Sequence, residues 1–287
     1  MKMKVQYKEK HSLKKEIRHL PKYIPLAIWL IFTVAMIGWI FIASLSTTSE
    51  IYNDGLLQSG LHFENYLNVL QRHKLGTYFL NSIIYCAAGC AGVILIASPA
   101  AYVLARIQFK GKNLVNNIFV VGMSIPSVML VMPLFKMATS LGLVGSRWVL
   151  IILYICVNVP FGVFFLSGFF ISLPKALEEA AEIDGCTPSK AFWKIMFPLA
   201  QPGIVTLTIF NFITIWNEYF MALIFANKTE LRTVSTGLQA IVQSMKYSGD
   251  WAGLFAGVII VFLPTFVLYI FLSNKIIAGV TGGAVKE

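Results

Sequence analysis

Charged residues are scarce in this chain. Only 13% of its 287 residues are Asp, Glu, Lys or Arg, whereas 57% are hydrophobic. That balance lies outside the range of soluble globular domains. Acidic residues are scarcer than basic ones: there are 13 Asp and Glu against 23 Lys and Arg, which gives a formal net charge of +10. A nucleic-acid-binding domain would cluster its bases on an otherwise polar domain, but here a basic N-terminal stretch runs directly into an apolar segment. The composition therefore predicts an integral membrane protein.

Cysteine and histidine are also rare, with four residues of each. The cysteines Cys86, Cys90, Cys156 and Cys186 form no CxxC pair, and three of them lie inside apolar segments, which favours simple packing roles. All four histidines lie outside the apolar segments, so the spans offer no evident haem or metal ligands. We expect no cofactor in this chain.

A nucleotide-binding phosphate loop is missing as well. The pair Gly111-Lys112 is followed by Asn113, and no glycine stands five residues before Gly111, so the chain has no G-x-x-x-x-G-K-[ST] sequence. If the protein uses energy from ATP, hydrolysis must take place on another polypeptide. The sequence thus favours a membrane subunit that is not itself an enzyme.

Six apolar segments are long enough to be transmembrane helices. They predict an all-α bundle of six spans, since no short alternating strands of a membrane barrel are present. We divide the chain into a basic N-terminal segment, 1–23, a six-helix transmembrane domain, 24–278, and a Gly-rich tail, 279–287. The six segments are Ile24–Ser44, Thr77–Leu104, Val115–Phe135, Trp148–Phe170, Gly203–Phe225 and Trp251–Leu272.

The orientation in the membrane follows from the bases in the connecting segments. Sixteen Lys and Arg residues lie on the side that holds the N-terminal segment and seven lie on the opposite side. Because cytoplasmic flanks carry the excess of bases, both termini and the loop 173–198 are predicted to be cytoplasmic. Tyr102 and Arg106, where the second span ends, are expected at the lipid headgroups.

The loop 173–198 is the longest polar stretch in the second half of the chain. Pro174 suits a first helical turn, Gly185 suits a left-handed stop, and Thr187 with Pro188 suits the start of a second helix that ends by Pro198. The sequence therefore predicts a helix, a sharp turn and a second helix. Small residues on one face of the first helix would let another protein surface approach closely.

Several residues of this loop carry a family resemblance. Glu179, Ala180 and Ala181 are followed after three residues by Gly185, and after nine more by Ile195, a spacer, Phe197 and Pro198. This pattern resembles the EAA motif of inner-membrane permeases of ABC transporters, with Phe197 where leucine is usual. The residues expected to couple to an ATPase are Glu179, Ala180, Ala181, Asp184, Gly185, Ile195 and Pro198.

Further stretches extend the resemblance over nearly the whole chain: the exit of the second span, the LGLVGS turn, the string WNEY in span five, and the tail from Gly282. The chain looks most like a carbohydrate importer permease of the maltose-transporter type. The resemblance implies a second permease subunit, a cytoplasmic ATPase dimer that grips the loop, an extracytoplasmic solute-binding protein and a sugar substrate. It also implies a multi-pass protein of a bacterial or archaeal cell membrane.

Glu218 is the only acid or base within the spans and away from their ends. Because a charge in that position is costly, it should face the bundle interior or a wet cavity. With Asn158, Asn211 and Asn217 it forms our set of candidates for lining the solute path. Hydrogen bonding between helices explains the asparagines equally well, and Glu218 can instead form a structural pair.

Other functions remain open at this point. A permease for another solute class, such as an amino acid or an osmolyte, would share the same motif. A passive channel predicts flux without ATP, and a membrane scaffold predicts no flux. Neither of the last two explains the spacing of the EAA-like residues.

Overall fold

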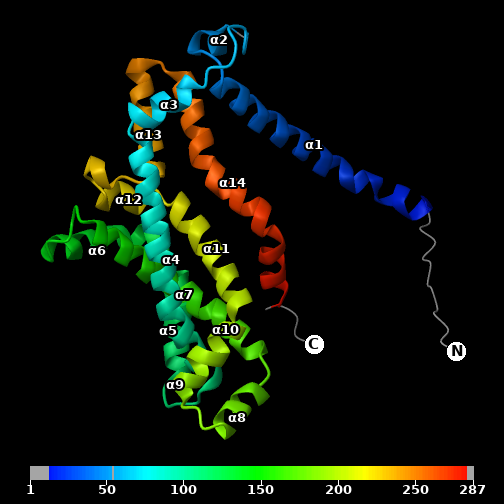
Figure 1. The fold of residues 1–287 in the computed structure, drawn as a ribbon, viewed down its shortest axis with the longest axis vertical. Coiled ribbons are helices and arrows are strands. Elements are labelled where there is room, and N and C mark those ends of the chain that lie inside the picture. The colour runs from blue at the N-terminus through cyan, green and yellow to red at the C-terminus, as the bar shows by residue number, and fades with distance from the viewer. Residues whose placement is uncertain (1–12, 54, 283–287) are drawn as a thin grey trace.

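The regular structure of the described residues is entirely helical (Figure 1). The computed structural model describes residues 13–53 and 55–282, and these contain no β-strand, in agreement with the predicted fold class. The elements are α1 (Leu13–Ser44), α2 (Thr48–Tyr52), α3 (Glu64–Gln71), α4 (Leu75–Arg106), α5 (Lys112–Ser124), α6 (Ser127–Ser140), α7 (Arg147–Ser172), α8 (Ala176–Ile183), α9 (Pro188–Ala191), a π-helix η1 (Phe192–Met196), α10 (Phe197–Leu199), α11 (Gln201–Asn217), α12 (Phe220–Phe225), a 3₁₀-helix η2 (Thr229–Leu231), α13 (Val234–Ser248) and α14 (Trp251–Gly282).

A parallel pair formed by α4 and α7 is the centre of the bundle, with both helices starting at the Asn81 end and ending near Arg106, and α11 packs beside it. Close approach depends on small residues: a Cβ added at Gly162 of α7 would lie 2.9 Å from the Cβ of Ala97 in α4. Small residues at such contacts are the usual means by which membrane helices pack. One apolar cluster surrounds Tyr85 and Trp216, and a second surrounds Phe170 towards the α8 end.

The outer helices α1 and α14 contrast with this centre. In their most apolar stretches only 6% and 11% of the residues are buried, against 39% in α4 and 50% in α7. In Figure 1, α1 projects away from the other helices. Exposed side chains such as Trp29 and Ile31 need an apolar environment, which lipid or a second protein supplies.

Among the described residues, four helices are long and apolar enough to cross a membrane, and two bent helix pairs raise the number to six if each pair is one span. The predicted third span, Val115–Phe135, differs from a straight helix because α5 and α6 meet at 100°. Ile125 and Pro126 are extended at the junction. Proline has no N–H to donate and keeps the preceding residue out of the helical region, which explains the break.

The predicted fifth span, Gly203–Phe225, is also interrupted. Helix α11 ends at Asn217 and α12 begins at Phe220, with Glu218 in an extended conformation between them. The prolines within the other predicted spans, at positions 99, 133, 160 and 264, lie inside helices. The break in the fifth span is therefore at the carboxylate, where no proline stands.

Short helices cap the two ends of the bundle. Helices α2, α3 and α13 lie at the end opposite α8 and α9 (Figure 1). Tyr66 lies in α3. Of the two terminal segments defined from the sequence, residues 1–12 and 283–287 lie outside the described residues, while α1 already begins at Leu13 and α14 continues to Gly282.

Candidate functional site: the 173–198 loop and the polar groups of the bundle

The loop 173–198 contains two short helices that meet at a tight turn. Helix α8 ends at Ile183, and Gly185 follows with φ +73°, a left-handed conformation that glycine adopts without strain. The N–H of Cys186 donates to the carbonyl of Ala181 at 2.9 Å, which closes the helix end. The hydroxyl of Thr187 then accepts from the N–H of Lys190 at the start of α9.

The small residues of α8 divide between an exposed and a buried face. Glu179 and Ala180 are exposed, and Ile183, one turn further on, is 87% exposed. Ala181 is only 2% exposed, so its side chain packs within this chain and is not available to a partner. The structure thus separates two residues that the sequence placed together, because adjacent helix positions point 100° apart.

Arg106, the last residue of α4, holds the start of this loop. Its guanidinium donates to the carbonyl of Leu173, and its Nε lies 3.4 Å from Oε2 of Glu178. The arginine side chain is 7% exposed and the glutamate 22%. Arg106 therefore does not extend to lipid headgroups as the sequence suggested, but links α4 to α8. Tyr102 is likewise buried, against Phe170 and Phe192.

The second half of the motif attaches the loop to the bundle. Helix α9 continues through η1 into α10 and ends at Leu199, where the chain bends by 72° into α11. Phe192 and Met196 are buried in the cluster around Phe170, and Ile195 is half-buried. Pro198 and Asp184 are exposed. The motif residues thus serve two surfaces, one facing the bundle and one facing solvent.

Glu218 stabilises the break between α11 and α12. Its carboxylate accepts from the N–H groups of Met221 at 2.7 Å and Ala222 at 3.0 Å, and from the hydroxyl of Tyr154 at 2.9 Å. A negative charge is favoured at a helix N-terminus, where N–H groups lack helical partners. These contacts match the structural-pair alternative: Glu218 joins α7, α11 and α12.

The three asparagine candidates do not gather around Glu218 through hydrogen bonds. The amides of Asn158 and Asn217 donate to carbonyls of their own helices, at Tyr154 and Ile213. Asn211 is 1% exposed, and its amide nitrogen has no hydrogen-bond partner among the described residues. Asn211 is thus the one of the three whose amide nitrogen is unsatisfied in this chain.

A second polar arrangement, which sequence reasoning missed, lies at the opposite end of the α4–α7 pair. The amide of Asn81 donates to the carbonyls of Glu230 and Arg232 at 2.7 and 3.0 Å, and the guanidinium of Arg147 donates to Asn81 at 2.8 Å. Tyr85 donates to the carbonyl of Leu231 at 3.0 Å. The only sequence feature that could have pointed to a role for Asn81 is its position as a polar residue near the start of an apolar helix.

These features define a multi-pass bundle of membrane-length helices with an exposed short helix held at one end. Comparison with known proteins identifies the family. A model of the family described as binding-protein-dependent transport system inner membrane components matches residues 94–274. The chain belongs to this family and is a membrane permease subunit of its transporters.

Curated relatives match along almost the whole chain. The diacetylchitobiose uptake system permease protein NgcG of Streptomyces coelicolor is 32% identical over 91% of this chain and 87% of its own length. The trehalose transport system permease protein SugB of Mycobacterium tuberculosis is 32% identical over 90% and 97%. The trehalose/maltose transport system permease protein MalG of Thermococcus litoralis is 33% identical over 86% and 90%.

Solved structures agree on the fold. A chain of a bacterial ABC transporter involved in the import of the acidic polysaccharide alginate superposes with a TM-score of 0.78 at 24% identity, covering 93% of this chain and 99% of that chain. The methionine ABC transporter MetNI gives a TM-score of 0.54 at 17% identity, covering 70% of this chain and 93% of its own. At these identities the likeness establishes fold alone.

Proposed function

We propose that this chain is one of two permease subunits of an ATP-driven importer for a sugar or oligosaccharide. Its partners are a second permease of similar fold, a cytoplasmic ATPase dimer and an extracytoplasmic solute-binding protein. The observation that carries the proposal is the exposed face of α8, in which Glu179, Ala180 and Ile183 stand free within a loop that carries the EAA-like spacing. The names of the relatives support a sugar as the solute.

Helix α8 has the properties of a docking element. It has eight residues, fewer than the roughly 12 to 15 that give even marginal helix stability alone. Its exposed face ends in an isoleucine that is almost fully accessible, and Ala180 beside it leaves room for a partner surface. Burial of such a face in an ATPase groove stabilises both the helix and the contact. Asp184 and Gly185 set where the helix ends.

Coupling then follows from the way α8 is attached. When the ATPases close, α8 moves as a rigid unit, and Arg106 transmits this movement to the end of α4. The bundle thereby changes between states open to one side and to the other. Ile195 and Pro198 act at the junction of the loop with α11. Asn211, Asn158 and Asn217 remain candidates for the solute path, and Glu218 acts by fixing the α11–α12 break.

This function requires a defined orientation. We place α8, the basic segment 1–23 and the tail 279–287 in the cytoplasm, and the α2, α3 and α13 end outside, with residues 24–278 as the permease domain. Exposed Lys190 reports on this assignment. In a variant whose four native cysteines are replaced, Lys190→Cys should react with a membrane-impermeant maleimide only after the cells are opened. Ready labelling of intact cells contradicts the orientation.

Uptake by the reconstituted transporter tests the solute class. The permease pair, the ATPase and the binding protein are placed in liposomes, and uptake of maltose, trehalose and diacetylchitobiose is compared with that of methionine and glycine betaine. The proposal predicts ATP-dependent uptake of at least one sugar and none of the other two solutes. Uptake of an amino acid or betaine instead assigns the chain to the alternative solute class. Flux without ATP indicates a channel.

A further inference from the structure

A cavity of about 330 Å³ lies between α12, the segment that follows it and α13. It is at the end of the bundle opposite α8 (Figure 1). Its size is at the lower end of the roughly 300–1,000 Å³ range of ligand pockets, which suits one small unit of a solute. We call it the amide-lined cavity. The residues around it are Leu223, Ala226, Asn227, Arg232, Thr236, Gln239, Ala240 and Gln243.

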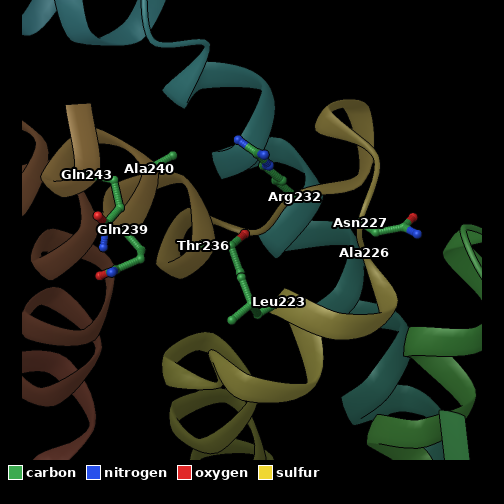
Figure 2. A pocket seen from close by; sticks show the side chains of 8 residues that line it. All are labelled: Leu223, Ala226, Asn227, Arg232, Thr236, Gln239, Ala240 and Gln243. Carbon is green, nitrogen blue, oxygen red and sulfur yellow. The ribbon is translucent and has the colours of Figure 1, made fainter. Parts of the chain in front are cut away.

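Helix α13 presents a polar stripe to this cavity. Thr236, Gln239, Ala240 and Gln243 recur at helical spacing and so lie on one face, while Ile241 on the other face is 3% exposed. Figure 2 shows the two glutamines side by side on α13, with Arg232 on the segment that leads into the helix. An amphipathic helix whose polar face lines a cavity is ready to bind a polar group.

Most of the polar side chains that line the cavity have no partner within the described residues; the exception is Thr236, whose hydroxyl is hydrogen-bonded to Thr233. Within the described residues, the side chains of Asn227, Arg232, Gln239 and Gln243 make no hydrogen bond or ion pair with another protein group. The backbone at Arg232 is nevertheless fixed by two hydrogen bonds to α4. The carbonyl of Arg232 accepts from the amide of Asn81, and the N–H of Val234 donates to the hydroxyl of Ser82 at 2.9 Å. The backbone of this segment is therefore fixed in position, while the side chains keep their donors and acceptors for a ligand.

The chemistry of the lining selects among solutes. Amide groups donate and accept hydrogen bonds, as sugar hydroxyl groups do, and the guanidinium adds donors. The eight lining residues include no acid to pair with an ammonium group and no aromatic ring to contact a quaternary ammonium. Leu223 and Ala240 offer apolar surface to the C–H groups of a sugar ring. An amino acid or a betaine therefore fits this lining less well than a carbohydrate.

We propose that the amide-lined cavity is a carbohydrate-contacting subsite on the outer part of the translocation path, in which Arg232, Gln239 and Gln243 hydrogen-bond the hydroxyl groups of the solute. The inference rests on the proposed function as a sugar importer. It adds a location and named contacts that the family does not supply. A neutral or acidic sugar is accommodated, since the only charged group in the lining is a cation.

The test uses the complete transporter in liposomes with its binding protein, and the sugar among maltose, trehalose and diacetylchitobiose that the wild type imports. The variants are Gln239→Ala, Gln243→Ala, the double variant and Arg232→Ala. Gln71→Ala is the matched control, because Gln71 is exposed at the same end and does not line the cavity. The measurements are initial uptake at low sugar concentration, docking affinity of the unloaded binding protein, and yield of assembled complex.

One lost hydrogen bond changes an equilibrium by about two- to tenfold, so each single variant should lower uptake by that factor and the double variant by more. Docking affinity, complex yield and the control should match wild type. Unchanged uptake in all variants overturns the subsite. Weakened docking of the binding protein also overturns it, because the surface is then a protein contact. A wild-type transporter that imports methionine and no sugar contradicts the proposed function itself, and is thus told apart from failure of the subsite alone.

Discussion

Two arginines hold loops at opposite ends of the α4–α7 pair, and the two ends differ in how many hydrogen bonds hold the loop. At the α13 end, Arg147 supports Asn81, which donates to two loop carbonyls, while Tyr85 and Ser82 hold neighbouring backbone groups. At the α8 end, Arg106 contacts the carbonyl of Leu173 and the carboxylate of Glu178, and the hydroxyl of Tyr102 also interacts with Glu178.

The difference shows how one helix pair supports two tasks. A loop held by many buried donors is rigid, which suits a fixed binding surface. The first half of the 173–198 loop is held by fewer buried donors, so α8 can change its angle at a modest cost while the contact with Arg106 persists. We therefore interpret the α13 end as the fixed part of the transporter and the α8 end as the lever.

Replacement of Asn81 should have the largest effect on this comparison. Asn81→Leu leaves two loop carbonyls without donors at a site where the side chain is 3% exposed. Each buried group left unsatisfied costs about 1–3 kcal/mol, so for the two carbonyls we expect a loss of about 2–6 kcal/mol. Thermal unfolding of the detergent-purified protein measures it. Asn53→Leu, at an exposed residue, is the control. Equal stability of the two variants would show that the hydrogen bonds of Asn81 do not hold the loop.

Arg106→Ala should uncouple the lever rather than unfold the bundle. A hydrogen bond to a charged group is worth about 1.5–3 kcal/mol, so we expect stimulation of ATP hydrolysis by the loaded binding protein to fall about tenfold or more. The complex should still assemble. Arg106→Lys keeps the charge with fewer fixed donors and should be intermediate. If Arg106→Ala couples as well as wild type, the link from α4 to α8 is ordinary packing.

Glu218→Gln tests the α11–α12 break with little change of shape. The amide retains one acceptor oxygen but places a donor among the N–H groups of Met221 and Ala222. We expect a stability loss of about 1–2 kcal/mol and reduced uptake, with the complex still assembled. Glu230→Gln, at an exposed carboxylate, is the control. Wild-type stability and uptake of Glu218→Gln would remove the capping role.

A smaller effect concerns pH at the α2 segment. The carboxylate of Glu50 accepts from the N–H of Thr47 at 2.7 Å and from the N–H and hydroxyl of Ser59, which lowers its pKa from 4.5 to about 2. Because the pKa of Glu50 is lower in the folded state than in the unfolded state, its carboxylate contributes to folding stability fully above pH 4.5. This contribution to stability is lost as the pH falls towards 2. The hydrogen-exchange protection factors of residues 47–53 and 55–60, corrected for the intrinsic exchange rate at each pH, should therefore fall below pH 4.5 in wild type. In Glu50→Gln they should be lower already at pH 6, with less change on acidification.

Local patterns predicted local structure well. The helical segments, the left-handed Gly185, the Thr187 cap and α3 all follow from residue types within a few positions of each other. The bend at Pro126 was not predicted as a change of direction, because proline in a membrane helix is compatible with either a kink or a break.

Long-range contacts could not be predicted in the same way. Arg106 and Leu173 are 67 residues apart, and Asn81 and Arg232 are 151 apart. Helical periodicity says which face is polar but not which distant carbonyl it contacts. The same limit explains Glu218, whose partners on α7 and α12 become neighbours only when α11 ends at Asn217.

The central claim is that the exposed face of α8 couples this permease to an ATPase. Its most direct test is ATP hydrolysis by the reconstituted complex, with and without loaded binding protein, for Ala180→Trp and Gly185→Val, with Gln108→Trp as a control at an exposed residue outside the loop. Overpacking at a contact costs about 1–3 kcal/mol, and a β-branched residue resists the left-handed turn. We predict that both variants insert into the membrane but lose ATPase binding or stimulated hydrolysis, while the control behaves as wild type. Wild-type binding and stimulation in both variants would contradict the account.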